Sequence, residues 1–459
     1  MQTSFSTLQY RVRESLEHLL QDSLYRNAFI YWMLLKFAQA YALSGAQGLE
    51  YYSSQLLLFA FAIELFSLFL VLKCLPSKII GPLDTLQIFT AIFLTIPLIT
   101  LTFNNSRFTS YTNYSALLCV IFFHYMLRIC KRLIRVNLTL RPLIRISMMQ
   151  IAFLLILLSL FLVATILTLG EFTFNISELD LVYARRIDFM ESITETGNSL
   201  FGYAFGWLGG VIAPLIFLFG IYLKRYTIII FSLVLGLFVY AGAAQKWILA
   251  SYFFIILVFY LCQKGLNLKN SSSMFFIGFN WMIVGALIFQ TLFSKSRIID
   301  LAVRRALMDP AIMLQHYVEF TRDYSFRFWQ DTRIGQFFNI DSGDPAARII
   351  GDRYFNIPTH FYQPRQTQSN ATAGALADSI SQAGLLGLFL TTLLIFLFFV
   401  TLEVFSKGKS KPIVLCVSAL SVEMLMEGTL HTLMLTRGLI IIPLVLYLLP
   451  NQENLKEEI

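Results

Sequence analysis

The sequence predicts an all-α membrane protein that crosses the bilayer about twelve times. Hydrophobic residues make up 57% of the 459 residues, charged residues only 14%, and the mean hydropathy is +0.68. A soluble chain of this length carries roughly a quarter charged residues. The apolar residues also fall in blocks of about 17–25, the length that crosses the hydrocarbon of a bilayer. Composition and block length together exclude a soluble globular domain.

The apolar blocks define the predicted spans in chain order. They lie near residues 27–43, 55–72, 86–103, 113–130, 146–169, 203–222, 226–243, 246–262, 274–294, 376–402, 412–430 and 433–450. The chain therefore divides into a cytoplasmic amphipathic segment (1–26), nine spans (27–294), a large polar loop (295–375), three further spans (376–450) and a tail (451–459). In the first segment Leu8, Val12 and Leu16 recur at helical spacing, which predicts a helix on the inner membrane surface.

Basic residues alternate between successive connections, and this alternation sets the orientation. One set of short connections carries nearly all of them, including Lys73, Arg132, Lys224 and Lys407, whereas the other set contains Arg107, with Lys246 at an edge. Because short cytoplasmic loops are enriched in Lys and Arg, both termini are expected in the cytoplasm. The long connections 170–202 and 295–375 then face outward.

The large outer loop is expected to contain one helix. Asp309-Pro310 is a helix-start signal, with an acceptor at the N-cap and proline at N1. Met313, Tyr317 and Phe320 follow as an apolar stripe at helical spacing. We expect a helix over about 310–323 that rests on the membrane-embedded body, and irregular chain after it to about residue 370. The aromatic residues that follow, such as Phe326 and Trp329, either pack on that body or stack on sugars.

Three clusters of basic residues are predicted to lie at the outer face. They are Arg185-Arg186, followed after ten residues by Gly197; Arg304-Arg305; and Lys246 between spans seven and eight. Arginine's planar fork matches phosphate geometry, so these five cations are candidates to hold a diphosphate. The alternative is that they bind lipid headgroups or pair with nearby acids, among them Asp300 and Asp309.

Candidate proton-transfer groups lie at the same face. Ionisable residues within spans are costly and mark functional sites or structural pairs. Glu427 and His431 are expected on one helical face at i, i+4, with Arg437 beyond them, and Glu427 is the preferred candidate base. His316 and His360 in the large loop are further candidates, although a lone histidine more often serves structure. Asn370, just before span ten, suggests a polar lining at a cavity mouth.

Neither a disulfide nor a metal site is expected. Five cysteines (Cys74, Cys119, Cys130, Cys262 and Cys416) lie within or at the ends of predicted spans, and no Cys/His spacing fits a metal. The net charge of +8 follows from topology, so no nucleic-acid partner is expected.

Several motifs together resemble the bacterial O-antigen polymerases (Wzy), a family of oligosaccharide repeat-unit polymerases. They are Tyr183-Ala184-Arg185-Arg186 with Gly197, the turn 242–246, Arg304-Arg305-Ala306 before Pro310, the run from Asn370 to Asp378 before Gly384 and Gly387, and the stretch from Glu427 to Gly438. The resemblance covers roughly residues 180–440. The first five spans match only in hydropathy.

The resemblance implies a metal-independent glycosyltransferase of the bacterial inner membrane, with a helical fold similar to the GT-C class and an active site facing the periplasm. Donor and acceptor would be oligosaccharides linked to undecaprenyl diphosphate, and the sequence leaves open whether a chain-length regulator protein is a further partner. The five cations would bind diphosphate, Glu427, His316 or His360 would be the base, and Tyr183, Tyr317, Asn370 and Asp378 would bind substrate.

Two other functions share this layout. A transporter (a flippase for lipid-linked glycans) also has about twelve spans with both termini inside, but carriers often consist of two similar halves, and no internal repeat is evident here. An O-antigen ligase, which joins finished polymer to a lipid A core, is the second alternative.

Overall fold

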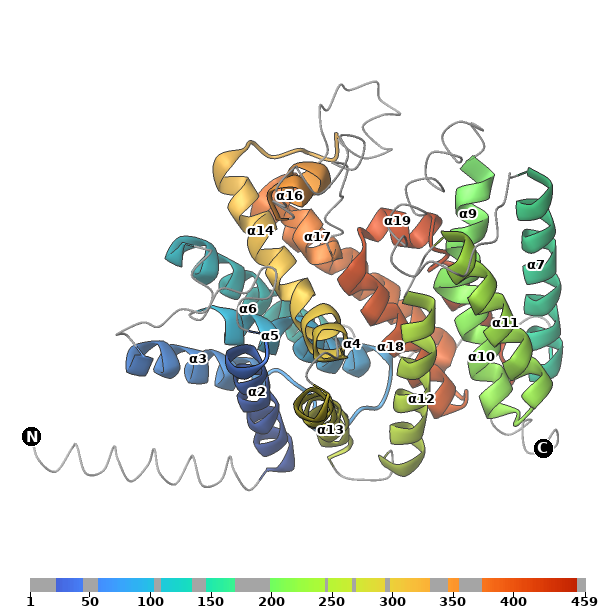
Figure 1. Cartoon of the computed structure of the whole chain (residues 1–459), viewed down its shortest axis with the longest axis horizontal. Coiled ribbons are helices and arrows are strands. Elements are labelled where there is room, and N and C mark those ends of the chain that lie inside the picture. The colour runs from blue at the N-terminus through green and yellow to red at the C-terminus, as the bar shows by residue number, and fades with distance from the viewer. Residues whose placement is uncertain are drawn as a thin grey trace, which may run out of the picture.

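The computed structural model describes residues 22–43, 57–102, 109–133, 146–169, 199–243, 247–265, 270–293, 298–330, 346–354 and 374–451. These residues form an all-helical structure of about 15 continuous helices (Figure 1). Five are long and apolar enough to cross a membrane: Pro82–Leu101, Met148–Thr168, Gly202–Tyr222, Ser271–Leu292 and Ala375–Ser406. Shorter apolar helices cover Phe59–Leu72, Tyr226–Gly242 and Ile248–Gln263.

Each predicted span overlaps a helix. The first nine spans correspond to α2 (Ser23–Tyr41), α3 (Leu57–Leu72), α4–η1–α5 (Pro82–Leu101), α6 (Ser110–Leu133), α7 (Met148–Leu169), α9–η3–α10 (Ser199–Tyr222), α11 (Tyr226–Ala243), α12 (Trp247–Gly265) and α13 (Ser271–Leu292). Spans ten and eleven correspond to α17 (Ala375–Ser406) and α18 (Lys411–Glu427). The twelfth differs, because its residues divide between α19 (Leu430–Leu435) and α20 (Ile441–Leu448). Eight residues of α20 rise only about 12 Å, less than half of the hydrocarbon thickness.

The helix 82–101 is the centre of the structure. All of its residues are buried, although it contains Asp84, Gln87 and several threonines. It packs against α18, α17, α14 and α6. At the edge α7, α10 and α11 stand together (Figure 1), and α7 exposes Phe153, Leu157 and Phe161. Apolar side chains exposed along a long helix suit contact with lipid.

Three helices widen into a π turn just before a proline. The π segments are η1 (Ala91–Thr95), η3 (Leu208–Ile212) and η4 (Asp300–Met308), and Pro97, Pro214 and Pro310 each lie two residues beyond the last π residue. Proline lacks an N–H and its ring clashes with the carbonyl four residues back. The wider turn moves that carbonyl away, and the residue before each proline donates its N–H five residues back instead.

Helix α17 is broken within its first third. Ala383 and Gly384 leave helical geometry, and Gly384 takes φ 57°, which favours glycine. Segment 326–329 covers the break: Arg327 N–H donates to the Ser381 carbonyl, Phe328 N–H to the Gln382 carbonyl, and Phe326 packs on Gly384. At Phe326 the aromatic chain after α14 therefore packs on the body of the protein, as one of the two predictions states.

Helix ends that the charge pattern assigns to one side of the membrane meet one another. At the predicted inner side, Asp84 of α4 forms an ion pair with Lys131 of α6, and Glu403 of α17 accepts the Leu83 N–H at 3.3 Å. At the predicted outer side, Asn113 of α6 accepts a 2.7 Å hydrogen bond from Gln315 of the large loop. The contacts are consistent with the predicted alternation of helix directions.

The helix predicted over 310–323 is present as α14 (Asp309–Asp323), but its setting differs from the prediction. Eight consecutive residues, 311–318, are buried. Consecutive residues point to every face of a helix, so α14 is enclosed by neighbouring elements and does not rest on a surface. Asp309 is not its N-cap either, because η4 runs into α14 without interruption. A second helix, α16 (Ala346–Tyr354), interrupts the chain predicted to be irregular.

Candidate functional site

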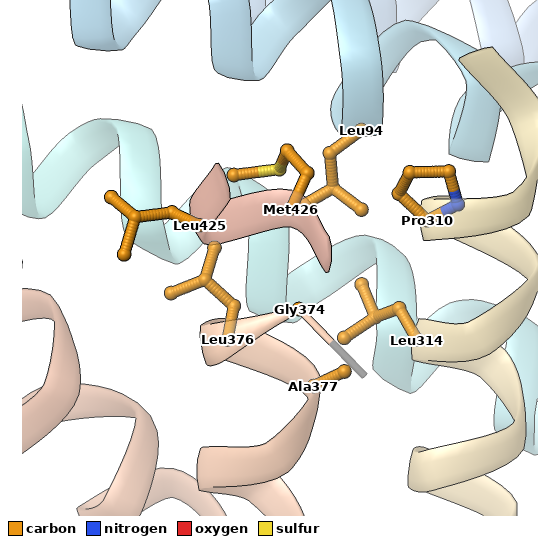
Figure 2. A pocket seen from close by; sticks show the side chains of 8 residues that line it. All are labelled: Leu94, Pro310, Leu314, Gly374, Leu376, Ala377, Leu425 and Met426. Atoms are coloured by element: carbon orange, nitrogen blue, oxygen red, sulfur yellow. The ribbon is translucent and has the colours of Figure 1, made fainter. Parts of the chain in front are cut away.

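Three helix ends meet around a small apolar pocket. Figure 2 shows Pro310 and Leu314 of α14, Gly374 and Leu376 at the start of α17, and Met426 at the end of α18 around it. Leu94, Ala377 and Leu425 complete the lining. About 10 Å³ of this space can hold the centre of a water-sized sphere, which is roughly room for one water molecule, so a sugar chain does not fit here. The pocket is informative because Asp309 and Glu427 adjoin it in sequence, and both belong to charged clusters.

The first cluster is built on η4. Arg304, whose side chain is 6% exposed, forms an ion pair with both carboxylate oxygens of Asp300, and its Nη1 lies 3.2 Å from Asp309 Oδ1. Arg305 is 38% exposed, and its Nε lies 3.6 Å from Asp300 Oδ2. The structure thus shows the pairing with Asp300 and Asp309 that was the alternative to diphosphate binding. Arg304 is already bound to two acids, whereas Arg305 makes the longer, more exposed contact.

Burial raises the pKa of Asp309 from its usual value to about 6, and the neighbouring Arg304 and Arg305 only partly offset that rise. The carboxyl therefore binds a proton more tightly in the folded than in the unfolded chain. Between about pH 4 and pH 6 the folded state gains stability from this group as the pH falls. A rise of about two pKa units corresponds to roughly 3 kcal/mol. Because the side chain is 28% exposed and therefore partly screened by water, we take the cost of ionising it above pH 6 as about 2 kcal/mol.

We expect Asp309→Asn to stabilise the protein at pH 7 by about 2 kcal/mol, because asparagine avoids the cost of a buried charge while Arg304 keeps Asp300. Thermal unfolding in detergent at pH 7 and pH 5 measures this, and the difference from wild type should shrink at pH 5. Asp323→Asn, on the same helix, is the control and should keep the wild-type pH dependence. An Asp309→Asn protein less stable than wild type at pH 7 would contradict the assignment.

The second cluster lies at the end of α18. Arg437 Nη1 lies 3.4 Å from Glu427 Oε2, and both side chains are partly exposed. One turn earlier, Glu423 is buried, and its carboxyl group interacts directly with Glu427 and with the charge of Arg437. The cluster therefore joins an accessible carboxylate to a buried carboxyl group and a guanidinium.

Glu427 and His431 belong to two different helices, so the predicted i, i+4 pairing on one helical face is wrong. Gly428 is extended and ends α18, and α19 begins at Leu430. The turn brings Gly428 so close to Leu433 that a Cβ on the glycine would lie 2.8 Å from that side chain. His431 lies 3.4 Å from the Thr429 hydroxyl.

The chain at the end of α19 and just after it packs against α9 and η3, which follow the outer connection 170–202. The Trp207 indole N–H donates to the Leu435 carbonyl at 2.6 Å. Gly206 and Gly210 face the backbone of Thr436 and Arg437 so closely that a Cβ at either glycine would overlap a carbonyl oxygen. Two glycines one turn apart thus fix the backbone position from which Arg437 reaches Glu427.

The remaining predicted residues within the described chain lie in or beside α14 and α17. His316 and Tyr317 are 5% and 1% exposed, so both belong to the packed interior. Asp378 is in the first turn of α17, where the helix dipole favours an acid, and accepts a 3.3 Å hydrogen bond from Gln382. The roles of these three as base and substrate-binding residues stay predictions.

Several predicted residues lie outside the described part of the chain. They are Tyr183, Arg185, Arg186, Gly197, Lys246, His360 and Asn370. Their assignments to diphosphate, base and substrate binding stay predictions as well. Within the described ranges no group of three His, Cys, Asp or Glu residues is arranged to hold a metal ion.

Sequence reasoning assigned no role to Glu423, Trp207, Gly206 and Gly210. The acidic pair Glu423/Glu427 at i, i+4 was a usable signal, since like charges so spaced repel unless the site needs them. The glycine pair at i, i+4 in an apolar helix was a second signal, because it permits close backbone approach.

Compared with protein-family models, curated proteins and solved structures, the chain matches none.

Proposed function

We propose that the chain is a repeat-unit polymerase: a glycosyltransferase that moves a growing glycan from undecaprenyl diphosphate to the non-reducing-end hydroxyl of a new lipid-linked repeat unit. In this proposal all twelve apolar segments belong to a GT-C-like membrane domain of the bacterial inner membrane, and the site faces the periplasm. One observation carries the proposal. An accessible carboxylate, Glu427, is held by Arg437 at the end of α18, beside a pocket that also borders the start of α14, directly after the two arginines of η4.

The reaction needs a base and a cationic site for the leaving group. The acceptor oxygen forms a bond to the donor's anomeric carbon as the bond from that carbon to the diphosphate oxygen breaks. The acceptor's proton passes to Glu427, and the electron pair of the broken bond leaves with the diphosphate. Positioned bases contribute about 10²–10⁴-fold to such reactions. Fixed cations stabilise the charge that develops on the leaving group.

Arginine and lysine side chains supply that positive charge in the proposal. Arg305 is the described residue best suited to it, because its guanidinium is the more exposed of the η4 pair. Arg185, Arg186 and Lys246 complete the predicted set. Arg304 has a different role: it neutralises Asp300 and Asp309 and thereby holds η4 in position.

Arg305→Ala should shorten the polymer without lowering the amount of folded protein, because the exposed guanidinium is lost and no buried charge is stranded. Arg304→Ala should instead destabilise the fold by about 1–3 kcal/mol, since it removes the closest partner of two partly buried carboxylates, Asp300 and Asp309. Membrane protein level and sugar-chain length in a complemented deletion strain report both effects. Arg322→Ala is the matched control on α14, where the arginine pairs with Glu319 and Asp323 near the surface. Full-length polymer in the Arg305 variant would remove Arg305 from the proposal.

The same deletion strain tests the function. Losing a polymerase leaves a lipid A core bearing one repeat unit, and losing a ligase leaves a bare core. Losing a flippase leaves repeat units on the inner leaflet. We expect the first pattern, and either of the others would overturn the proposal.

The orientation has its own test. A single cysteine at Tyr324, after α14, should react with a membrane-impermeant maleimide added outside intact spheroplasts. A cysteine at Lys407, between α17 and α18, should react only after the membrane is opened. Lys407 and Tyr324 are both outside the helices and have negative φ, which limits the structural cost. The five native cysteines are free and are first replaced. The reverse labelling pattern would place Glu427 in the cytoplasm and end the proposal.

A further inference from the structure

Glu423 is the one buried carboxyl group of α18, and it lies directly behind the proposed base. The residue is 8% exposed, and its Oε2 is fully buried with no hydrogen-bond partner among the described residues. Glu427 follows at i+4, so both side chains lie on one face of the helix. Glu427 is 38% exposed, which makes it the outward member of the pair.

Charge counting shows that this cluster holds more acid than base. In the described chain the charged groups that act on Glu423 are Glu427, on its own helix, and Arg437, after α19. Among the residues that the structure describes, the elements packed against α18, chiefly α4, α12 and α17, add no further cation to that set. One guanidinium cannot balance two carboxylates, and an unbalanced carboxylate away from water is strongly disfavoured. Two carboxyl groups that share such a site hold one proton between them.

The position of each carboxyl decides which one carries the proton. Arg437 Nη1 contacts Glu427 Oε2, so the negative charge is stabilised on Glu427. The other carboxyl group, in apolar surroundings, takes the neutral form.

From this geometry we infer that Glu423 is protonated and serves as the positioning residue for Glu427. The positioning role rests on the proposed function, in which Glu427 is the base. The protonation of Glu423 does not depend on that function. The Glu423 O–H donates to one oxygen of the Glu427 carboxylate, and Arg437 donates to the same group. Two donors from fixed directions leave Glu427 one orientation, in which its remaining lone pairs face outward to the acceptor hydroxyl. After transfer, the exposed Glu427 returns the proton to water.

The protonation of Glu423 is tested by infrared spectroscopy on the purified full-length protein in lipid at neutral pH. The difference between the wild-type and Glu423→Gln spectra should contain the carbonyl band of a protonated carboxylic acid, because the variant loses that band. Glu319→Gln, an ion-paired acid on α14, is the control and should lose carboxylate bands instead. Loss of carboxylate bands in the Glu423 variant would overturn the inference. This readout needs no activity, so it remains decisive even if the protein does not polymerise glycans.

The positioning role is tested by kinetics. Glu423→Gln keeps a donor toward Glu427 and should retain activity within about fivefold, whereas Glu423→Ala should lower kcat about 10²-fold at similar KM. Thermal unfolding confirms that both variants are folded, and rescue by glutamine separates positioning from packing. Equal activity of the alanine variant and wild type, or equal loss in both variants, would overturn the positioning role. If the wild-type protein shows the infrared band but does not polymerise glycans, the proposed function is rejected and the inference that Glu423 is protonated stands.

Discussion

Glu427→Gln is expected to lower the rate of glycan polymerisation by about 10²–10⁴-fold while the protein stays folded. The amide cannot accept the proton of the acceptor hydroxyl, and general-base catalysis of that size is then lost. Glutamine keeps the shape of the side chain and an oxygen for Arg437, which is 3.4 Å away. The measurement is single-turnover extension of a lipid-linked repeat unit by purified protein.

Glu319→Gln is the matched control for this substitution, because Glu319 lies on α14 and pairs with Arg322 away from the cluster. Its rate should equal that of wild type. A Glu427→Gln rate within a few-fold of wild type would show that another group takes the proton. The predicted alternatives, His316 and His360, would then be tested in the same way.

Gly206→Ala should produce the second large effect, on the position of Arg437. The added Cβ would overlap the Thr436 carbonyl oxygen, which is backbone and cannot rotate aside. The chain after α19 must shift, the hydrogen bond from Trp207 to Leu435 lengthens, and Arg437 moves away from Glu427. Overpacking of this kind costs about 1–3 kcal/mol, and we expect polymerisation to fall more than tenfold. Unfolding midpoint and polymer length measure the two consequences.

Gly285→Ala is the control, since a Cβ there meets no atom within 4 Å. In a helix this change removes the entropic cost of glycine, so stability should stay the same or rise by about 0.5–1 kcal/mol. If Gly206→Ala behaved like Gly285→Ala, the docking of the 436–437 backbone on this helix would not hold Arg437 in place.

Hydrophobicity predicted the helices well where a segment is uniformly apolar. The segment 226–243 was predicted as a span and is α11 with the same bounds. There is one physical reason: an apolar segment of that length satisfies its backbone polar groups only as a helix in lipid.

The prediction of the twelfth span failed because hydropathy does not register backbone geometry. Residues 433–450 are apolar, yet Gly438 at φ 76° turns the chain between α19 and α20. The extended Gly428 likewise separates Glu427 from His431. The two glycines were the available signal. Their conformations depend on tertiary contacts, because Gly428 faces Leu433 and Gly438 faces Trp207.

The candidate site was partly predictable. The sequence indicated that Glu427 and Arg437 belong to one outer region, and the structure pairs them. It also contained the alternative for Arg304, namely Asp300 four residues earlier and Asp309 five residues later, and the structure shows that pairing. The burial of Tyr317 was not predictable from its apolar stripe, because a stripe identifies one face and says nothing of the helices that cover the others.

The most direct measurement is extension of a defined lipid-linked repeat unit by the purified protein in lipid vesicles, with chelator present and no lipid A core added. The account predicts a ladder of lipid-linked glycans that differ by one repeat unit, and the ladder should be lost in the Glu427→Gln protein. Repeat units that stay unextended, or that only change leaflet, would contradict it.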